Sequence, residues 1–369
     1  NMTDLKTDTM FVNMGPQHPS TPGVLRLGLT LSGEIIVKAE PDIGYLHRGT
    51  EKLAELRGYH QCVVMTDRWD YVSAMPNNLV FCLAAEKLMN LEISSRANYL
   101  RVLMCEINRI ASHLLFLGTY GIDIGAYTPF LYAFREREMV LDLFEMACGA
   151  RTTFNYIRIG GVSADLPQGW TEKCREFLNY FKGKIREYDD LLTYNPIFLD
   201  RTKTVGILSK ETALDWGLTG PNLRGSGVPY DVRKTDPYCV YDKLDFDVCV
   251  GETGSCWDRY HVRVLEMTQS IRIVEQCLGQ LPAGDVMAKG VAKIPKPPAG
   301  EAYAHVEASR GDLGIYLVAD GSSAPYRLHA RAPSYINLAV LQEILTGLKL
   351  ADVIAILGST DIVLGEVDR

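Results

Sequence analysis

The sequence lacks the cysteine patterns that bind metals or build disulfide frameworks. Its 369 residues include nine cysteines, an odd number, and no two of them are spaced as C-x-x-C. Disulfide-rich domains carry even sets of cysteines, whereas zinc and iron–sulfur sites commonly use closely spaced pairs. The spacing therefore argues against a cysteine-ligated metal site within this chain and indicates a protein of a reducing compartment.

Blocks of basic residues, phosphate-binding loops and hydrolase motifs are also missing. The net charge is −7 and the basic residues are scattered, so the sequence gives no indication of nucleic-acid binding. It contains no G-x-G-x-x-G, no phosphate loop, no nucleophile elbow and no H-E-x-x-H. Residues 1–10 are polar and have no apolar core, so we expect no signal peptide there.

One apolar stretch is long enough to cross a membrane. Between Ile110 and Phe134 the only acidic or basic residues are His113 and Asp123. Three glycines and Pro129 interrupt this stretch, and a carboxylate at its middle would be costly in lipid. We therefore expect two buried helices joined by a tight bend, with membrane contact made through partner subunits.

The order of local patterns predicts an α+β fold. Alternating leucines over 25–31, a Ser32-Gly33 turn and the run 35–39 indicate a hairpin. Three- and four-residue apolar spacing predicts long helices, the first capped by Ser94 or Ser95, over residues 100–117, 137–147, 177–192 and 264–278.

The last part of the chain reads differently. A proline-rich linker over 289–300 precedes short strand-like runs, which we expect at 302–307, 314–319 and 326–330, and a helix at 337–348. The chain thus divides into a β-rich N-terminal region (1–65), a central long-helix bundle (66–285) and a C-terminal α/β region (286–369).

Two segments place a histidine beside prolines or a glycine. GPQHPSTPG (15–23) holds His18 in a stiff loop, where it is either a ligand-facing imidazole or part of a structural turn. IGYLHRGTEK (43–52) places His47 and the permanent cation Arg48 where the backbone can approach a ligand. The alternative for Arg48 is a surface salt bridge to a nearby glutamate.

Two further segments carry ionisable groups beside apolar sequence. TDRWDYVSAM (66–75) contains Arg68 and Tyr71, and a tyrosine phenol with a pKa of about 10 can donate a hydrogen bond to a carbonyl oxygen. The alternative is a core tyrosine. Glu106, Arg109 and His113 share one helical face, and Asp123 follows; these form either a site or a structural ion network.

At these clusters the chain closely resembles the D-type, quinone-site core subunit of NADH:quinone oxidoreductase (respiratory complex I), which is related to the large subunit of nickel–iron hydrogenases. The resemblance runs nearly end to end. Its motifs are GPQHP (15–19), IGYLHRGTEK (43–52), DRWDY (67–71), DIGAYTPF (123–130), FRERE (134–138), YIRIGGV (156–162), LRGSGVPYDVRK (223–234) and DIVLGEVDR (361–369).

The resemblance implies a quinone-reduction site in a chain that holds no redox centre of its own. Quinone would be the substrate, reduced beside a four-iron four-sulfur cluster held by a small partner subunit. The tyrosine matching Tyr71 hydrogen-bonds the quinone, and the arginine matching Arg48 lies near the cluster. Asp123 and His18 complete the implied catalytic set, and the implied cofactor-binding set is Arg48, His47, His113 and Arg68.

The implied assembly is a proton-pumping complex peripheral on the cytoplasmic face of the inner or plasma membrane (the matrix side if mitochondrial). Its other partners would be further peripheral-arm subunits and a membrane-arm subunit at the quinone entrance. The chain alone is not expected to be active.

One loop departs from the family pattern. The family reads HP-x-x-HG, whereas this chain reads HPSTPG (18–23), so Pro22 replaces the second histidine, which normally partners the aspartate matching Asp123. Proline has neither a titratable ring nor an N–H donor. We therefore expect Asp123 to be neutral, bridged by water, or paired with another base such as His113 or an arginine.

Three alternatives stay open at this stage. The chain could serve a dehydrogenase fed by reduced deazaflavin or ferredoxin, as the loop and the short linker at 289–300 suggest. A scaffold that binds no quinone is a second reading, and a hydrogenase large subunit a third. The hydrogenase needs C-x-x-C pairs that this chain lacks.

Overall fold

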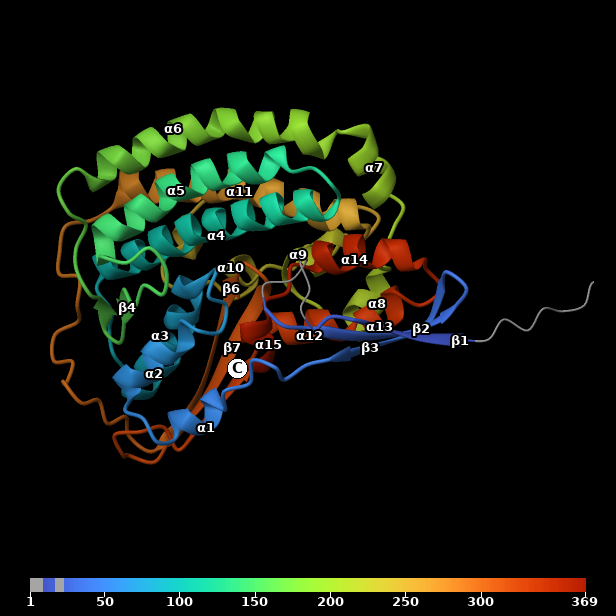
Figure 1. Ribbon diagram of the computed structural model, residues 1–369. Coiled ribbons are helices and arrows are strands. Elements are labelled where there is room, and N and C mark those ends of the chain that lie inside the picture. Colours follow the sequence, from blue (N-terminus) through green and yellow to red (C-terminus); the bar gives the residue numbers. More distant parts are fainter. Residues whose placement is uncertain (1–8, 17–22) are drawn as a thin grey trace, which may run out of the picture.

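Four long helices lie side by side in the upper layer of the molecule (Figure 1). The computed structural model, which describes residues 9–16 and 23–369, gives their bounds as α4 (Ser95–Asp123), α5 (Thr128–Cys148), α6 (Trp170–Tyr188) and α11 (Cys256–Gln280). Apolar side chains from all four fill one large core. These helices confirm the periodicity found in the sequence.

The bend between α4 and α5 is tight, as the sequence predicts. The Ala126 N–H donates to the Gly121 carbonyl at 2.7 Å, and Pro129 stands in the first turn of α5, where its missing N–H costs nothing. A Cβ at Gly118 would come within 3.1 Å of the Phe130 Cα, so glycine lets the two helices approach. Among the described residues, no helix combines the length and the hydropathy needed to cross a membrane.

A shorter helix and an antiparallel sheet form the layer below. Helix α3 (Ala74–Met89) packs against the three-stranded sheet β6 (Gly300–Ala308), β7 (Gly311–Ala319) and β8 (Arg327–Arg331), in the order β6-β7-β8. The short helices α1 (Thr50–Ala54) and α2 (Tyr59–Thr66) lead into α3. The loop before β6 contains the predicted linker.

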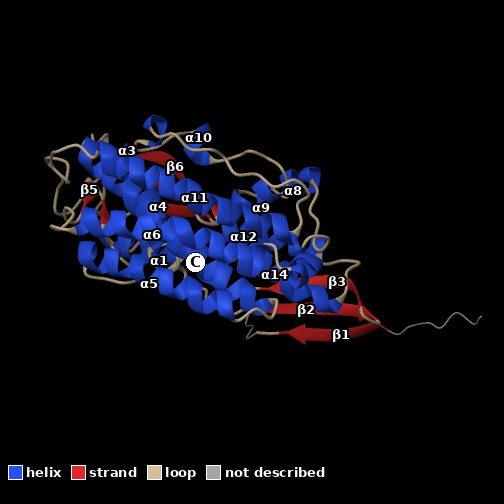
Figure 2. Ribbon diagram, turned by 90° about the horizontal axis from the view of Figure 1, so that it is seen from above, coloured by secondary structure: helices blue, strands red, loops and turns tan. Residues whose placement is uncertain are grey.

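The two ends of the described chain share a second core. Strands β1 (Thr9–Met14), β2 (Arg26–Ser32) and β3 (Ile35–Asp42) form an antiparallel sheet at one edge of the molecule (Figure 2). Its buried leucines pack against the helices that end the chain: α12 (Pro333–Ala339), α13 (Leu341–Ile344), α14 (Val353–Thr360) and α15 (Leu364–Asp368). The Ile36 N–H donates to the Leu348 carbonyl at 2.9 Å, which ties sheet and helices together.

Several predicted bounds need correction. The helix expected at 337–348 is two short helices, α12 and α13. Pro333 starts α12 early at a favourable first-turn position, and Gly347, with φ +85°, turns the chain toward β3. The helix expected from residue 137 begins at Thr128 instead. Ser94 caps α4 as expected, accepting the Ala97 N–H at 3.1 Å.

Short elements connect these layers. They are β4 (Ile157–Arg158), β5 (Gly161–Val162), a π-helical turn (Asp189–Thr193), α7 (Pro196–Thr202), α8 (Lys210–Asp215), α9 (Gly220–Gly225), α10 (Val232–Thr235) and two 3-10 turns (Tyr241–Lys243 and Leu350–Asp352).

Candidate active site

The turn between α2 and α3 presents Tyr71 at the surface of the core. Trp69, before it, is buried, and the Asp70 carboxylate accepts the N–H groups of Val72 and Ser73, each at 3.2 Å. The second oxygen of Asp70 accepts Nη1 of the buried Arg310 at 3.1 Å. Fixed on both sides in this way, the turn holds the half-buried Tyr71 in one place.

The segment between β3 and α1 carries His47 and Arg48, and the end of the chain holds it. The Asp368 carboxylate accepts the N–H of Gly44 at 2.8 Å and of Leu46 at 2.7 Å. The Asp368 carbonyl lies 2.6 Å from Nδ1 of His47. Since a carbonyl can only accept, Nδ1 of His47 donates the proton in this hydrogen bond.

Glycine is needed where this segment enters α1. Gly49 precedes the helix with φ +62°, a left-handed conformation that a side chain would strain. The Leu53 N–H donates to the Gly49 carbonyl at 2.8 Å. The turn at Gly49 thereby leaves Arg48 at the surface beside the Tyr71 turn.

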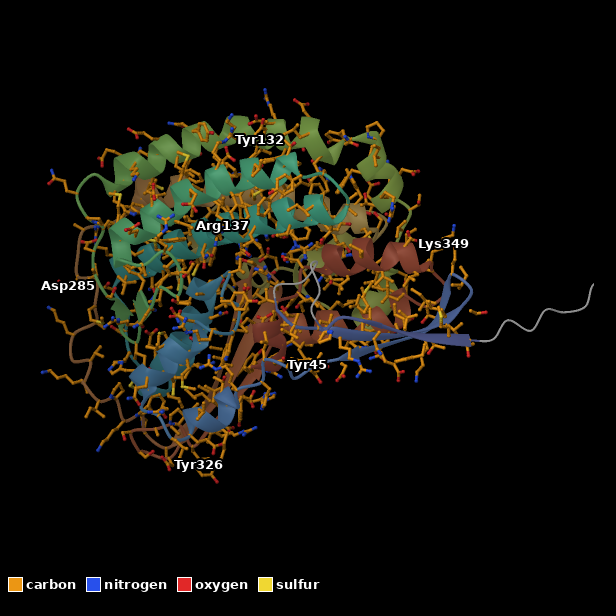
Figure 3. The ribbon with its side chains drawn as sticks, in the orientation of Figure 1. Tyr45, Tyr132, Arg137, Asp285, Tyr326 and Lys349 are labelled. Atoms are coloured by element: carbon orange, nitrogen blue, oxygen red, sulfur yellow. The ribbon has the colours of Figure 1, made fainter. Side chains whose placement is uncertain are left out.

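These segments enclose a pocket of about 490 Å³, which falls in the range of small-molecule sites. Its lining residues are Tyr45, Leu46, His47, Arg48, Thr50, Arg68, Trp69, Tyr71, Gly365 and Arg369. Of the described residues in this lining, three are arginines and none is acidic. It brings together four residues predicted from the sequence: Tyr71, Arg48, His47 and Arg68. Tyr45 lies on the lower side of the molecule, and Tyr132 on α5 lies in the upper layer (Figure 3).

The phenol of Tyr71 is a neutral donor. Burial and, to a smaller extent, the nearby Asp70 carboxylate raise the pKa of Tyr71 to about 12. A phenol with that pKa keeps its proton at neutral pH, so it can donate a hydrogen bond to a carbonyl oxygen in the pocket. The arginine side chains in the lining supply permanent positive charge to the pocket.

A second, smaller pocket of about 360 Å³ adjoins the first along α1 and α2. We call it the α1–α2 groove, and its lining residues are Arg48, Thr50, Leu53, Arg57, Gln61, Val64, Met65 and Arg68. It shares Arg48, Thr50 and Arg68 with the Tyr71 pocket. Leu53 and Val64 are each about two-fifths exposed, so the groove combines apolar side chains with positive charge.

His113 lies elsewhere, in a buried ion network. Its Nε2 is 2.8 Å from Glu266 of α11, and burial lowers the pKa of the imidazole. Glu266 also accepts Arg224 at 2.6 Å. Of the options that the sequence left for Asp123, pairing with His113 is excluded, because Nε2 is bonded to Glu266 and Nδ1 makes no hydrogen bond within the described chain. The pocket gives no geometric support to the predicted cofactor-binding role of His113.

Glu106 and Arg109 belong to the same network, which confirms their expected shared face. Glu106 accepts Arg233 at 3.0 Å and the Tyr241 hydroxyl at 2.6 Å. Burial acts to raise the pKa of Glu106, but Arg109 and Arg233 lower it to about 2. The sequence left two alternatives for Glu106 and Arg109, a site or a structural ion network. The structure shows the ion network.

The remaining predicted residues either do not line the pocket or lie outside the residues that the structure describes. Asp123 ends α4, and a Cβ at Gly358 of α14 would meet its Oδ2 at 2.9 Å. His18 and Pro22 lie outside the described residues. Over the described ranges, no group of three or more His, Cys, Asp or Glu side chains is placed to hold a metal ion.

Sequence reasoning missed the contribution of the C-terminal segment. Gly365 packs directly under the Tyr71 turn, because a Cβ there would lie 2.7 Å from the Trp69 carbonyl oxygen and 3.0 Å from Cε1 of Tyr71. Arg369 lines the pocket, and Asp368 holds its other wall. The only signal in the sequence was the motif at 361–369.

Comparison with known proteins gives one family match and several relatives along the whole chain. Residues 123–296 and 288–369 match the family described as "Respiratory-chain NADH dehydrogenase, 49 Kd subunit". A Desulforamulus reducens protein, named as the D-type subunit of NADH-quinone oxidoreductase, is 54% identical over 364 residues, covering 99% of each chain. Proteins of the same name from Bacillus mycoides and Bacillus anthracis are 54% identical over 365 residues, covering 99% of this chain and all of theirs.

A family match over more than half of the chain, together with relatives of this identity along its whole length, is decisive. The chain belongs to the family of the 49 kDa subunit of the respiratory-chain NADH dehydrogenase.

Proposed function

We propose that this chain is the subunit that shapes the quinone-reduction site of a proton-pumping NADH:quinone oxidoreductase. The observation that carries the proposal is the neutral phenol of Tyr71 in a pocket whose described lining has three arginines and no acid. Full-length relatives named as the D-type subunit of NADH-quinone oxidoreductase support it.

The chemistry of the pocket suits a carbonyl that gains electrons. A quinone takes up two electrons and two protons to become a quinol, and negative charge builds on its carbonyl oxygens before the protons arrive. The Tyr71 hydroxyl would donate a hydrogen bond to one such oxygen. A donor fixed before the reaction stabilises developing charge without reorganisation and is worth about 10²- to 10³-fold in rate.

The α1–α2 groove would receive the partner subunit that holds the four-iron four-sulfur cluster. Exposed apolar side chains rimmed by charge are typical of protein interfaces. Arg48 lines both the groove and the Tyr71 pocket, so it would stand between the partner's cluster and the quinone. A permanent cation there would raise the potential of the cluster.

The same assignment implies where the membrane and the remaining subunits lie relative to this chain. We place the chain in the peripheral arm on the cytoplasmic face, beside a membrane-arm subunit at the quinone entrance. Asp123 and His18 remain proposed members of the catalytic set. The electron donor is taken to be NADH, as in the names of the relatives.

The test is the Tyr71→Phe variant of the assembled complex. We expect its quinone reductase turnover to fall by about 10²-fold, because one donor to the developing charge is lost. Tyr194→Phe is a matched control, since Tyr194 is exposed and absent from the described pocket lining. Unchanged turnover in an assembled Tyr71→Phe complex would falsify the proposal.

A further inference from the structure

A buried glutamic acid, Glu366, lies behind the Tyr71 turn and has no role in the proposed quinone chemistry. Glu366 is fully buried in α15, directly after Gly365, the residue that supports the Tyr71 turn. Its Oε2 accepts the Ser334 N–H at 3.0 Å. Its Oε1 has no hydrogen-bond partner within the described residues.

The Arg310 guanidinium lies near enough to Glu366 for its charge to act on it. Its hydrogen bonds, however, go to other groups. Arg310 donates Nη1 to Asp70 at 3.1 Å and Nη2 to Asp361 at 3.0 Å. It also donates Nη1 to Ser112 and Nε to the Asp361 carbonyl. Its hydrogen bonds therefore serve two other carboxylates.

The distribution of donors decides which carboxyl holds a proton. Burial raises the pKa of Asp70 as well, but Asp70 accepts two backbone N–H groups and Arg310, which oppose this effect and favour its anion. Glu366 accepts one N–H and is close enough to Asp70 to be repelled by its charge. A buried carboxylate with so little compensation is costlier than the neutral acid. The geometry therefore favours a proton on Oε1 of Glu366 over one on Asp70.

We propose that Glu366 is a positioning residue of the quinone site that must be protonated for quinone reduction. The charges of Asp70 and Arg310 already act on Tyr71, and Arg310 donates to both Asp70 and Asp361. Ionisation of Glu366 would add a further negative charge to this cluster, which would oppose the negative charge that builds on the quinone oxygen. The inference rests on the proposed function and adds that the protonation of a buried acid controls quinone reduction.

The shift of the Glu366 pKa agrees with this reading. Burial, followed by the charge of Asp70, raises the pKa of Glu366 to about 7, with smaller opposing effects from Ser334 and Arg310. The groups that face it are thus Asp70 before α3, Arg310 between β6 and β7, and Ser334 in α12. Ionisation would fall within the working pH range of a respiratory enzyme.

The experiment compares pH profiles of the assembled complex carrying Glu366→Gln with those of the native complex. Glutamine keeps the shape of the neutral acid and cannot ionise. We expect native quinone reduction to decline by about fivefold as pH rises from about 6 to about 9, and the variant to lose most of this decline. Electron transfer to an artificial acceptor upstream of the pocket, measured in parallel, corrects for other pH-sensitive steps.

Glu136→Gln is the matched control, because Glu136 is equally buried but is bonded to Tyr180 and Tyr188 in the upper layer. It should keep the native pH profile. A native-shaped profile in Glu366→Gln overturns the inference. Glu366→Ala, a second neutral variant, gives the same comparison of profile shape if the glutamine form does not assemble.

A stability measurement provides a readout apart from activity. Because folding raises the pKa of this acid, the folded chain binds more protons than the unfolded chain between about pH 4.5 and 7, so stability falls as pH rises through that interval. Glu366→Gln should flatten that slope, and an unchanged slope counts against the inference. If Tyr71→Phe lowers turnover while both Glu366→Gln readouts stay native, this inference fails and the proposed function stands.

Discussion

Replacing Gly365 by alanine should damage the site through a single methyl group. The added Cβ would lie 2.7 Å from the Trp69 carbonyl oxygen, 3.0 Å from the Arg68 carbonyl oxygen and 3.0 Å from Cε1 of Tyr71. Two of these atoms are backbone and cannot rotate away. The turn or α15 must therefore move by roughly 0.7 Å to restore an ordinary contact, at a cost of about 1–3 kcal/mol for overpacking.

The same movement displaces the phenol. A misplacement approaching 1 Å can cost on the order of 10²-fold in rate, so we expect quinone reductase turnover to fall between about tenfold and 100-fold. Gly183→Ala is the matched control, because Gly183 lies exposed within α6 with open space around its Cα, and alanine there should stabilise the chain by about 1 kcal/mol. Native turnover and native thermal stability in Gly365→Ala would refute the contact between α15 and the Tyr71 turn.

Two further substitutions test other parts of the account. Arg224→Met should destabilise the chain by about 3–5 kcal/mol, because it leaves Glu266 and Glu307 without their buried partner, and thermal unfolding measures this loss. Arg272→Met breaks two exposed ion pairs and should cost less than about 1 kcal/mol; equal losses in the two variants would contradict the buried network. Arg48→Met should lower the midpoint potential of the cluster in the proposed partner subunit, measured by a redox titration followed by electron paramagnetic resonance; an unchanged potential would contradict the placement of Arg48 beside that cluster.

The parts of the site that the sequence predicts are those close together along the chain. The segments 43–52 and 66–75 are separated by two short helices, so His47, Arg48 and Tyr71 reach one pocket through local structure. The long helices could also be predicted from the sequence, since apolar spacing alone predicts a helix with one buried face.

The rest depends on contacts between distant segments. Gly365 and Asp368 meet the site from about 300 residues away in the sequence, and no local pattern indicates which turn they support. The partner of His113 was missed for the same reason. Helical spacing places His113 beside Arg109, but only the packing of α4 on α11 brings Glu266 to its ring.

The most direct test of the central claim is a structure of the assembled complex with a quinone or a quinone-site inhibitor bound. We predict that the Tyr71 hydroxyl donates to a ligand carbonyl oxygen at about 2.7 Å, with Arg48 on the side that faces the iron–sulfur cluster of the proposed partner subunit. A ligand bound away from Tyr71, or a cluster on the opposite side of the molecule from Arg48, would contradict it.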